Sequence, residues 1–280
     1  WGTGNPGPDW NGDARLGDNL YSDSALALNG DTGELEWYFQ FTPHDVHDWD
    51  AIQVPILADI EYEGATRQVI MWANRNAFYY TLDRATGEFL VGEPYATQTW
   101  ALGLDANGRP MRAPNTIPTY EGVVVSPSVG GGTNWWSAAY SPRSELFYVN
   151  AFDGEQRFFK RDEEYERGER FTGGGGSYTR PMDTYYSALR AIDPATGDIA
   201  WEFPVQPRTS AGISTTAGDL VLSGSVDGYF YALDANTGEE LWHISLGRRV
   251  HAAPMTFAVA GKQYITVAAG NVVYTFALRD

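Results

Sequence analysis

The chain has 280 residues, of which 43% are hydrophobic and 14% aromatic; this composition supports a large core and excludes a disordered chain. Its formal net charge of −17 argues against a nucleic-acid partner, because a polyanion would be repelled. The absence of cysteine excludes disulfides, thiolate metal sites and CxxCH haem attachment within the chain, and no window approaches the roughly 18 to 20 consecutive apolar residues of a membrane span.

In chain order, four segments repeat one pattern: an apolar residue, Asp or Asn, two variable residues, Thr-Gly, an acidic residue, and an apolar or Trp ending. They are "LNGDTGELEW" (28–37), "LDRATGEFLV" (82–91), "IDPATGDIAW" (192–201) and "LDANTGEELW" (233–242). Each predicts a hairpin in which an aromatic strand meets a turn whose glycine supplies a positive φ. The Trp that ends the second strand is predicted to be a packing wedge between neighbouring sheets.

A degenerate fifth copy, "YSPRSELFYV" (140–149), places Ser144 in the turn. Turn residues at 32, 86, 144, 196 and 237 are separated by 54, 58, 52 and 41 positions, which suits four-stranded blades with loop insertions. We therefore predict an all-β protein, a β-propeller domain over residues 1–280 with about five blades. A chain that begins at Trp1 in mid-motif is expected to be part of a longer propeller.

Three segments are predicted to lie outside the blades. Residues 160–170, "KRDEEYERGER", are a charged insertion, either a solvated loop or a short helix. The glycine runs at 130–132 and 173–176 lack the Gly-Lys-Ser/Thr ending of a phosphate-binding loop and are predicted to be flexible propeller loops.

The stretch "TPHDVHDWDA" (42–51) carries His44, Asp45, His47, Asp48 and Asp50 directly after the first Trp-bearing strand. Loops at one mouth of a propeller surround its central channel, so these side chains could face an axial ligand. Carboxylates suit hard cations such as calcium or a lanthanide, whereas zinc would prefer the histidines. From the residues alone, a solvated acidic turn, a metal site and an acid/base site all stay open.

Several long motifs occur together in one order: "WGTGNPGPDWNGDARLGDNLYSDS", "FQFTPHDVHDWD", "ANRNAFYYTLDRATGEFL" and "GGTNWWSAAYSP". Their combination resembles the pyrroloquinoline quinone (PQQ) dependent alcohol dehydrogenases, the eight-bladed quinoproteins of the methanol and ethanol dehydrogenase type. The resemblance runs almost from end to end and implies the C-terminal part of such a propeller, since family members are roughly twice as long.

The resemblance implies a metal site. Asn5 matches the family's Gly-Asn-Pro asparagine and Asp48 the aspartate of the His-Asp-x-Trp-Asp loop, while the third ligand, a Glu from an earlier blade, has no counterpart here. Asp48 also matches the proposed general base, which takes the hydroxyl proton while hydride passes to PQQ. Asp50 matches the second aspartate of lanthanide-using members, so a lanthanide is expected, with Ca²⁺ as the alternative.

The resemblance also implies cofactor contacts and partners. Arg75 matches the arginine that binds the quinone oxygens, and Asn134 and Trp135 match residues at the cofactor's polar edge. Expected partners are a primary alcohol and a cytochrome c acceptor, in the periplasm, with a homodimer possible. Two departures stand out: His47 replaces the family's usual Trp, and Ser210 falls where some members place a Trp near PQQ.

A second reading is a non-catalytic propeller of the same repeat, acting as a scaffold in envelope protein assembly. Such a scaffold has no reason to keep Asn5, Asp48, Asp50, Arg75 and Asn134 together, so their co-occurrence favours the enzyme. The 280 residues by themselves are expected to be inactive, because a propeller lacking blades has open sheet edges and a half-lined channel.

Overall fold

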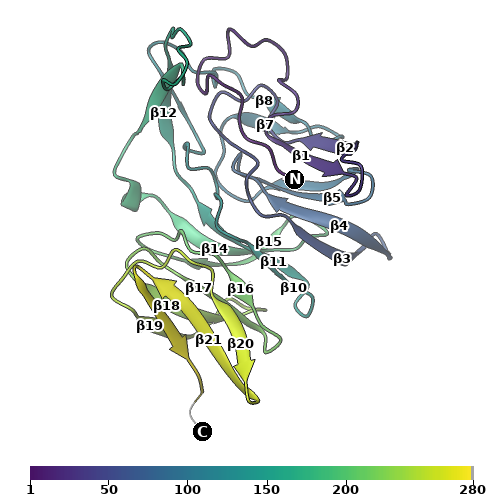
Figure 1. Cartoon of the computed structure of the whole chain (residues 1–280), viewed down its shortest axis with the longest axis vertical. Coiled ribbons are helices and arrows are strands. Elements are labelled where there is room, and N and C mark those ends of the chain that lie inside the picture. Colours follow the sequence, from purple (N-terminus) through teal and green to yellow (C-terminus); the bar gives the residue numbers. More distant parts are fainter. Residues whose placement is uncertain (279–280) are drawn as a thin grey trace.

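The computed structural model describes residues 1–278, which are built almost entirely of antiparallel β-strands (Figure 1). The helical content of this range is a single 3-10 turn, η1 (Met182–Thr184). Among the described residues, no helix is long and apolar enough to cross a bilayer. The predicted all-β class is confirmed.

Three sheets have four strands each, and in each the strands lie side by side in the order in which the chain forms them, with β12 and β13 inserted between the second and third strands of one sheet. The first contains β3 (Ile56–Tyr62), β4 (Ala65–Ala73), β5 (Phe78–Asp83) and β6 (Phe89–Pro94). The second contains β10 (Ala139–Ser141), β11 (Leu146–Phe152), β14 (Ser187–Ile192) and β15 (Ile199–Pro204). The third contains β16 (Ser214–Thr215), β17 (Leu220–Gly224), β18 (Tyr229–Asp234) and β19 (Glu240–Ser245). Successive four-stranded antiparallel sheets of this kind are the blades of a β-propeller.

Two smaller sheets lie at the ends of the array. The N-terminal sheet contains β1 (Ser24–Leu28) and β2 (Leu35–Gln40), and the C-terminal sheet contains β20 (Met255–Val259), β21 (Lys262–Ala269) and β22 (Val272–Phe276). Figure 1 shows the N-terminal sheet at the upper right and the C-terminal sheet at the bottom, so the blades form an open array. Every residue of β20 is exposed.

Two further sheets come from insertions between the blades: β7 (Ala101–Leu104) with β8 (Pro110–Arg112), and β9 (Val123–Val125) with β12 (Gln156–Lys160) and β13 (Gly174–Tyr178). The charged segment after β12 contains no helix, so its loop alternative is correct. The glycine run at 173–176 is not the predicted loop, because residues 174–176 pair with β12. A Cβ on Gly176 would lie within 2.0 Å of the Gln156 amide, so these glycines allow the strands to approach.

The repeat turns owe their shape to the aspartate that begins them. The Oδ1 atom of Asp83 accepts hydrogen bonds from the N–H groups of Ala85 and Thr86, at 2.9 and 3.0 Å. Asp234 holds the turn between β18 and β19 in the same way. Because an Asx turn followed by a glycine reverses the chain locally, the predicted hairpins form at all four complete copies of the repeat.

The fifth copy of the repeat is not equivalent to the others, so its prediction as a separate blade is wrong. The turn at Ser144 joins β10 to β11, the first hairpin of a sheet, whereas the turn at Thr196 joins β14 to β15, the last hairpin of the same sheet. The insertions that contain β7 to β9 and β12 to β13 increase the number of residues between the true repeat turns of neighbouring blades. The turn at Ser144, which lies in this long interval, was therefore mistaken for a repeat turn. The fifth sheet of the array is the one formed by β20 to β22.

Two of the repeat tryptophans, Trp37 and Trp201, pack against the Thr-Gly turn of the next sheet, as the wedge prediction requires, whereas Trp242 contacts Phe230 and Phe276 and is 42% exposed. Trp37 on β2 donates from Nε1 to the Arg84 carbonyl at 3.3 Å, and Trp201 on β15 donates to the Ala235 carbonyl at 3.1 Å. A Cβ on Gly238 would lie 2.5 Å from the Trp201 ring. Glycine is therefore needed in the turn both for its positive φ and for contact with the neighbouring blade.

We expect Gly238→Ala to destabilise the fold by about 2–4 kcal/mol, because the new methyl group meets the Trp201 ring and φ is +73°. Gly247→Ala is the matched control: φ is +66° but no atom lies within 4 Å of its Cβ position, so the cost should be about 1 kcal/mol. Urea midpoints of the intact protein measure both changes. Equal losses would show that the tryptophan does not press on this turn in solution.

Apolar side chains fill the spaces between successive sheets. One cluster joins β3, β4 and β5 to β11, where the rings of Tyr79 and Phe147 have centroids 5.1 Å apart. The next two clusters join the β10–β15 sheet to the β16–β19 sheet, and that sheet to β21 and β22. Because each blade packs on its neighbour, the loops that precede the first strand of each blade are carried to the same end of the array.

Candidate active site

The loop between β2 and β3, which carries the ionisable side chains of residues 44–50, is built around Asp45. Its side chain is fully buried, with Oδ1 accepting from the His47 N–H at 2.9 Å and Oδ2 from the Trp49 N–H at 2.7 Å. Burial raises the pKa of Asp45, while these two N–H groups act in the opposite direction. Asp45 is therefore the structural centre of the loop.

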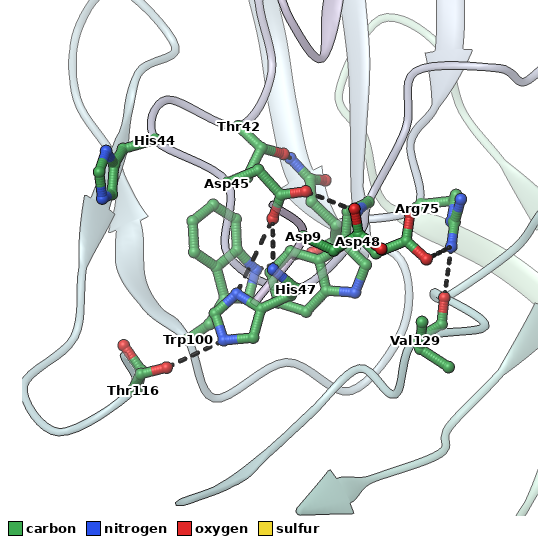
Figure 2. Close-up of polar contacts among 12 residues, drawn as sticks. Asp9, Thr42, His44, Asp45, His47, Asp48, Arg75, Trp100, Thr116 and Val129 are labelled. Atoms are coloured by element: carbon green, nitrogen blue, oxygen red, sulfur yellow. Dashed lines mark hydrogen bonds and ion pairs between the residues drawn. The ribbon is translucent and has the colours of Figure 1, made fainter. Parts of the chain in front are cut away.

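The two histidines of the loop face partners other than Asp48 and Asp50, and the Nδ1 atom of His47 lies 3.9 Å from Asp45 Oδ1. The backbone of His44 has φ = +51°. Its ring Nδ1 lies 2.8 Å from the Gly17 carbonyl oxygen, and in Figure 2 the ring points away from Asp48. His47 is fully buried, with Nε2 2.9 Å from the Thr116 carbonyl and its ring stacked on Trp49 at 4.3 Å. Burial, reinforced by the Arg112 guanidinium, lowers the pKa of His47 well below its usual value, so the ring is neutral. A stacked neutral imidazole fills this position instead of serving as a metal ligand.

Asp48 and Asp50 both contact the guanidinium of Arg75, and Figure 2 shows Asp48 beside Arg75. Arg75 Nη1 is 3.0 Å from Asp50 Oδ2, and Nη2 is 3.8 Å from Asp48 Oδ2. The same Nη2 donates to the Val129 carbonyl at 2.5 Å. Asp48 adopts φ = +64°, which sets the direction of its side chain between two buried neighbours, Trp49 and His47.

Arg75 is positioned by a tight turn between β4 and β5. Asn74 Oδ1 accepts from the Asn76 N–H at 3.0 Å, and Asn76 Oδ1 accepts from the Phe78 N–H at 2.9 Å. The "NRN" motif thus holds an arginine between two turn-forming amides, and the Arg75 side chain is only 7% exposed. A buried guanidinium requires carboxylate partners, which Asp48 and Asp50 provide.

Asn5 joins the site through its backbone and a neighbour that the sequence did not single out. The Asn5 N–H donates to Asp50 Oδ1 at 2.7 Å, and its side-chain Nδ2 donates to Asp9 Oδ1 at 3.1 Å. The contact with Asp9 fixes the orientation of the Asn5 side-chain amide, so its oxygen is the atom that could bind a cation. Asp9 lies four residues beyond Asn5 in "NPGPD", a short spacing that could have indicated the pair.

Burial raises the pKa of Asp48 to about 7; the Arg75 charge acts against this rise and the Asp50 charge adds to it. In the absence of a cation, Asp48 is therefore half protonated near neutral pH. A polyvalent cation beside the carboxyl would lower this pKa and hold Asp48 in the basic form that a proton acceptor needs.

The loop that precedes β10 meets Arg75 from the other side. The Gly132 N–H donates to the Arg75 carbonyl at 3.0 Å, and a Cβ on Gly131 would lie 2.8 Å from the Arg75 Cβ. The Asn134 amide holds its own loop by donating to the Gly130 carbonyl at 2.9 Å. The ring of Trp135, a predicted cofactor contact, is 57% exposed.

Three of the buried donors that have no hydrogen-bond partner among residues 1–278 belong to Arg75 and to the loop that contacts it. They are Arg75 Nε, Thr133 Oγ1 and Trp136 Nε1. Buried N–H and O–H groups are rarely left unpaired, so these atoms suit the polar edge of a ligand. Sequence reasoning missed Trp136 because it singled out the adjacent Trp135.

The donor set fits a hard cation only in part. Within the described range, no three His, Cys, Asp or Glu side chains come together with the geometry of a metal site. The oxygens of Asp48, Asp50 and Asn5 are the right donor type for calcium or a lanthanide. Asp48 and Asp50 contact the Arg75 guanidinium, and Asn5 is joined to Asp50 through its backbone N–H.

Two family models match the chain. The glucose/ethanol/alcohol dehydrogenase β-propeller domain matches residues 1–93, and the outer membrane protein assembly factor BamB matches residues 187–280. The first region contains the Asn5 loop, the loop between β2 and β3, and Arg75. The second contains two copies of the Trp-bearing repeat.

Curated relatives match nearly the whole chain. The quinoprotein alcohol dehydrogenase PedH from Pseudomonas putida is 37% identical over 278 residues, which is 96% of this chain and 47% of that protein. The quinoprotein ethanol dehydrogenase of Pseudomonas putida is 35% identical over 288 residues, covering 96% of this chain and 46% of its own length.

Solved structures agree. Quinohemoprotein alcohol dehydrogenase ADHIIG from Pseudomonas putida HK5 superposes with a TM-score of 0.90 at 35% identity, covering 96% of this chain and 42% of that one. A europium-containing methanol dehydrogenase gives a TM-score of 0.89 at 33% identity, covering 95% and 48%.

The fold and the site together define a β-propeller of the quinoprotein class. The chain belongs to the family of the quinoprotein alcohol dehydrogenases, and it spans about half the length of the curated relatives it matches.

Proposed function

We propose that the intact protein carrying this chain oxidises a primary alcohol to the aldehyde with PQQ and a metal ion. The observation that carries the proposal is the convergence of Asp48, Asp50, Asn5 and Arg75, from three separate segments, on one mouth of the propeller. When bound, PQQ supplies the two-electron oxidising chemistry that no side chain has. The protein supplies position, charge and a proton acceptor.

In this proposal Asp48 receives the hydroxyl proton of the alcohol at its carboxylate. Asp48 is the acidic residue of the site that is partly exposed and has a pKa raised to about 7, so it can both reach a substrate and change protonation state. Arg75 holds Asp48 and Asp50 in place and keeps their charges compatible with burial. Arg75 Nε and the Asn134 to Trp136 segment would bind the polar edge of the cofactor.

The cation in the proposal is a lanthanide, with Ca²⁺ as the alternative. Asp50 brings a second full negative charge to within 3.0 Å of the guanidinium that Asp48 also contacts, and Asp9 lies beyond Asn5. A trivalent ion is better neutralised by this number of carboxylates than a divalent one. The similarity to a europium-containing methanol dehydrogenase supports the choice.

Partners and location belong to the same proposal. We propose a cytochrome c acceptor and a periplasmic location, in line with the relative named 1-butanol dehydrogenase (cytochrome c) from Thauera butanivorans. The net charge of −17 would favour docking of a basic electron acceptor. A homodimer also remains a prediction, as does the inactivity of the 280 residues by themselves.

The test is alcohol-dependent dye reduction by the intact protein reconstituted with PQQ and either La³⁺ or Ca²⁺. We expect La³⁺ to support turnover and Asp50→Ala to lower it at least about 10-fold, because one charged ligand is lost. Asp59→Ala, which changes a half-exposed carboxylate paired with Arg84, is the control and should keep its turnover.

Other results would revise the proposal in stated ways. Turnover with Ca²⁺ only, unchanged in Asp50→Ala, would assign calcium and leave Asp50 a structural partner of Arg75. No PQQ binding and no turnover with either ion would favour the scaffold reading, which the match of residues 187–280 to the assembly-factor model supports.

A further inference from the structure

Four loops meet at the mouth of the propeller, and two of them, 205–213 and 246–254, contain none of the residues of the Asp48 site. The loops at 41–55, 127–138, 205–213 and 246–254 precede β3, β10, β16 and β20, the first strands of successive sheets. Contacts join them in a row. Trp49 donates to the Ser128 carbonyl at 3.0 Å, the Ile213 N–H donates to the Ser137 carbonyl at 2.9 Å, and a Cβ on Gly212 would lie 2.6 Å from Ala253. The last two loops are therefore continuous with the Asp48 site.

The charges of these loops are opposite at the two ends of the row. The 41–55 loop contributes Asp45, Asp48 and Asp50, whereas the 205–213 and 246–254 loops contain three arginines, Arg208, Arg248 and Arg249, and no acidic residue. This basic segment belongs to a chain of net charge −17. Such an asymmetric mouth suits a ligand that carries negative charge at the end away from Asp48.

A serine of one basic loop and a histidine of the other contact each other where the two loops meet. Ser210 Oγ is 2.9 Å from His251 Nδ1, and Ser210 is only 3% exposed while His251 is exposed. Thr209 anchors the first loop: its Oγ1 donates to the Gly224 carbonyl at 2.7 Å and accepts from the Ala211 N–H at 3.2 Å. The Ser210 hydroxyl is thus held in a fixed place beside an imidazole that reaches solvent.

Each loop carries an arginine two residues before its member of the pair: Arg208 precedes Ser210, and Arg249 precedes His251. Burial, and then the positive charges of Arg249 and Arg208, lower the pKa of His251. Arg208 Nε is buried without a hydrogen bond among the described residues. Its nearest carboxylate is Asp183, 3.6 Å away and 69% exposed, which is a weak competitor for an incoming anion.

We propose that Ser210, His251 and Arg208 form a carboxylate-binding site at the mouth of the propeller. The inference rests on the proposed function and deepens it, because two molecules of that reaction could bring a carboxylate here. PQQ carries three carboxylates, and an alcohol substrate could carry one at its far end. Ser210 Oγ and His251 Nδ1 hydrogen-bond each other, so the pair keeps one donor for a ligand: the ring Nε2–H when the hydroxyl donates to Nδ1, or the hydroxyl when Nδ1 donates to it. Arg208 adds a guanidinium, and carboxylate oxygens accept from both kinds of donor.

The first arm of the test measures cofactor affinity without turnover. Quenching of tryptophan fluorescence gives the Kd of PQQ for the intact protein, and we expect Arg208→Gln to raise it about 10-fold or more and Ser210→Ala several-fold. Arg208→Lys keeps the charge and should recover most of the affinity. Arg143→Gln, which alters an exposed arginine paired with Asp219, should leave the Kd unchanged. Thermal melts confirm that each variant is folded.

The second arm measures the substrate. In the loaded protein, KM is compared for 1-hexanol and 6-hydroxyhexanoate, which differ by one carboxylate. If the substrate is the source, Arg208→Gln will raise KM for the hydroxy acid alone and leave the Kd of PQQ unchanged. If the cofactor is the source, the Kd will rise and both substrates will respond alike.

The failures are distinguishable. A wild-type protein that binds PQQ and oxidises alcohol, with Arg208→Gln and Ser210→Ala unchanged in both arms, would overturn the carboxylate site and leave the proposed function standing. A wild-type protein that neither binds PQQ nor oxidises an alcohol would overturn both.

Discussion

Asp48→Asn should lower kcat for alcohol-dependent dye reduction by about 10²- to 10⁴-fold in the intact, PQQ-loaded protein, because an amide cannot accept the hydroxyl proton. The substitution keeps the shape of the side chain beside Arg75 and removes its basicity. Raising the metal concentration should not restore turnover, since the missing group is a base as well as a ligand.

The pH profile provides a second readout of the same residue. Burial raises the pKa of Asp48 to about 7 without a cation, so the base form dominates only above neutral pH. A bound cation lowers this pKa, and we expect kcat/KM of the wild-type protein to rise with pH along a limb whose apparent pKa lies below 7. The limb should disappear in Asp48→Asn.

The control for Asp48 is Asp219→Asn, which changes a carboxylate paired with Arg143 on the surface and should keep kcat within about twofold. If Asp48→Asn kept a tenth or more of the wild-type kcat, the proton acceptor would have to be a different group. Asp9, whose pKa is raised by burial and which lies beside Asn5, would be the next residue to test.

Asp23→Asn should stabilise the protein at pH 7 by about 1–3 kcal/mol, because the amide is neutral at every pH, whereas the buried carboxyl must take up a proton at pH 7 or be buried as an unpaired charge. Asp23 precedes β1, is fully buried, and neither of its carboxylate oxygens accepts a hydrogen bond from the described residues. Burial, and then the charge of Asp45, raises the pKa of Asp23 well above its usual value.

The sign of the pH dependence follows from this rise. Between the ordinary aspartate pKa of about 4 and the raised folded-state value, the folded protein binds a proton that the unfolded chain has released. Stability linked to Asp23 is therefore present at acidic pH and is lost as pH rises through that window. Urea midpoints from pH 4.5 to 7.5 should show a steeper decline for wild type than for Asp23→Asn.

Asp31→Asn is the control for Asp23, because Asp31 sits in an exposed turn and its charge should not affect stability. A wild-type curve as flat as that of Asp23→Asn would mean that Asp23 is ionised and paired in solution. Stabilisation by Asp31→Asn of equal size would point to general relief of negative charge in a chain of net −17.

The blades could be predicted from the sequence because their signals are local. An aspartate that accepts two backbone N–H groups and a glycine at positive φ make a turn whatever surrounds them. The copy at Ser144 was wrongly predicted to mark a separate blade, because a turn pattern does not indicate whether it joins the first two or the last two strands of a sheet. Only the pairing of β10 with β11, and of β14 with β15, resolved that.

Motif spacing and family resemblance therefore picked out the residues of the site, and the tertiary structure gave them different tasks. Asp45, His47 and Asp48 are neighbours in the chain, yet Asp45 is a buried turn centre, His47 a neutral stacked ring, and Asp48 a partly exposed carboxylate on Arg75. The reason is that burial and partners come from segments far apart in sequence, such as Thr116, Ser128 and Val129. The sequence by itself determined the repeat and the chemical types at the mouth; packing of one blade on the next decided which of those side chains face a ligand.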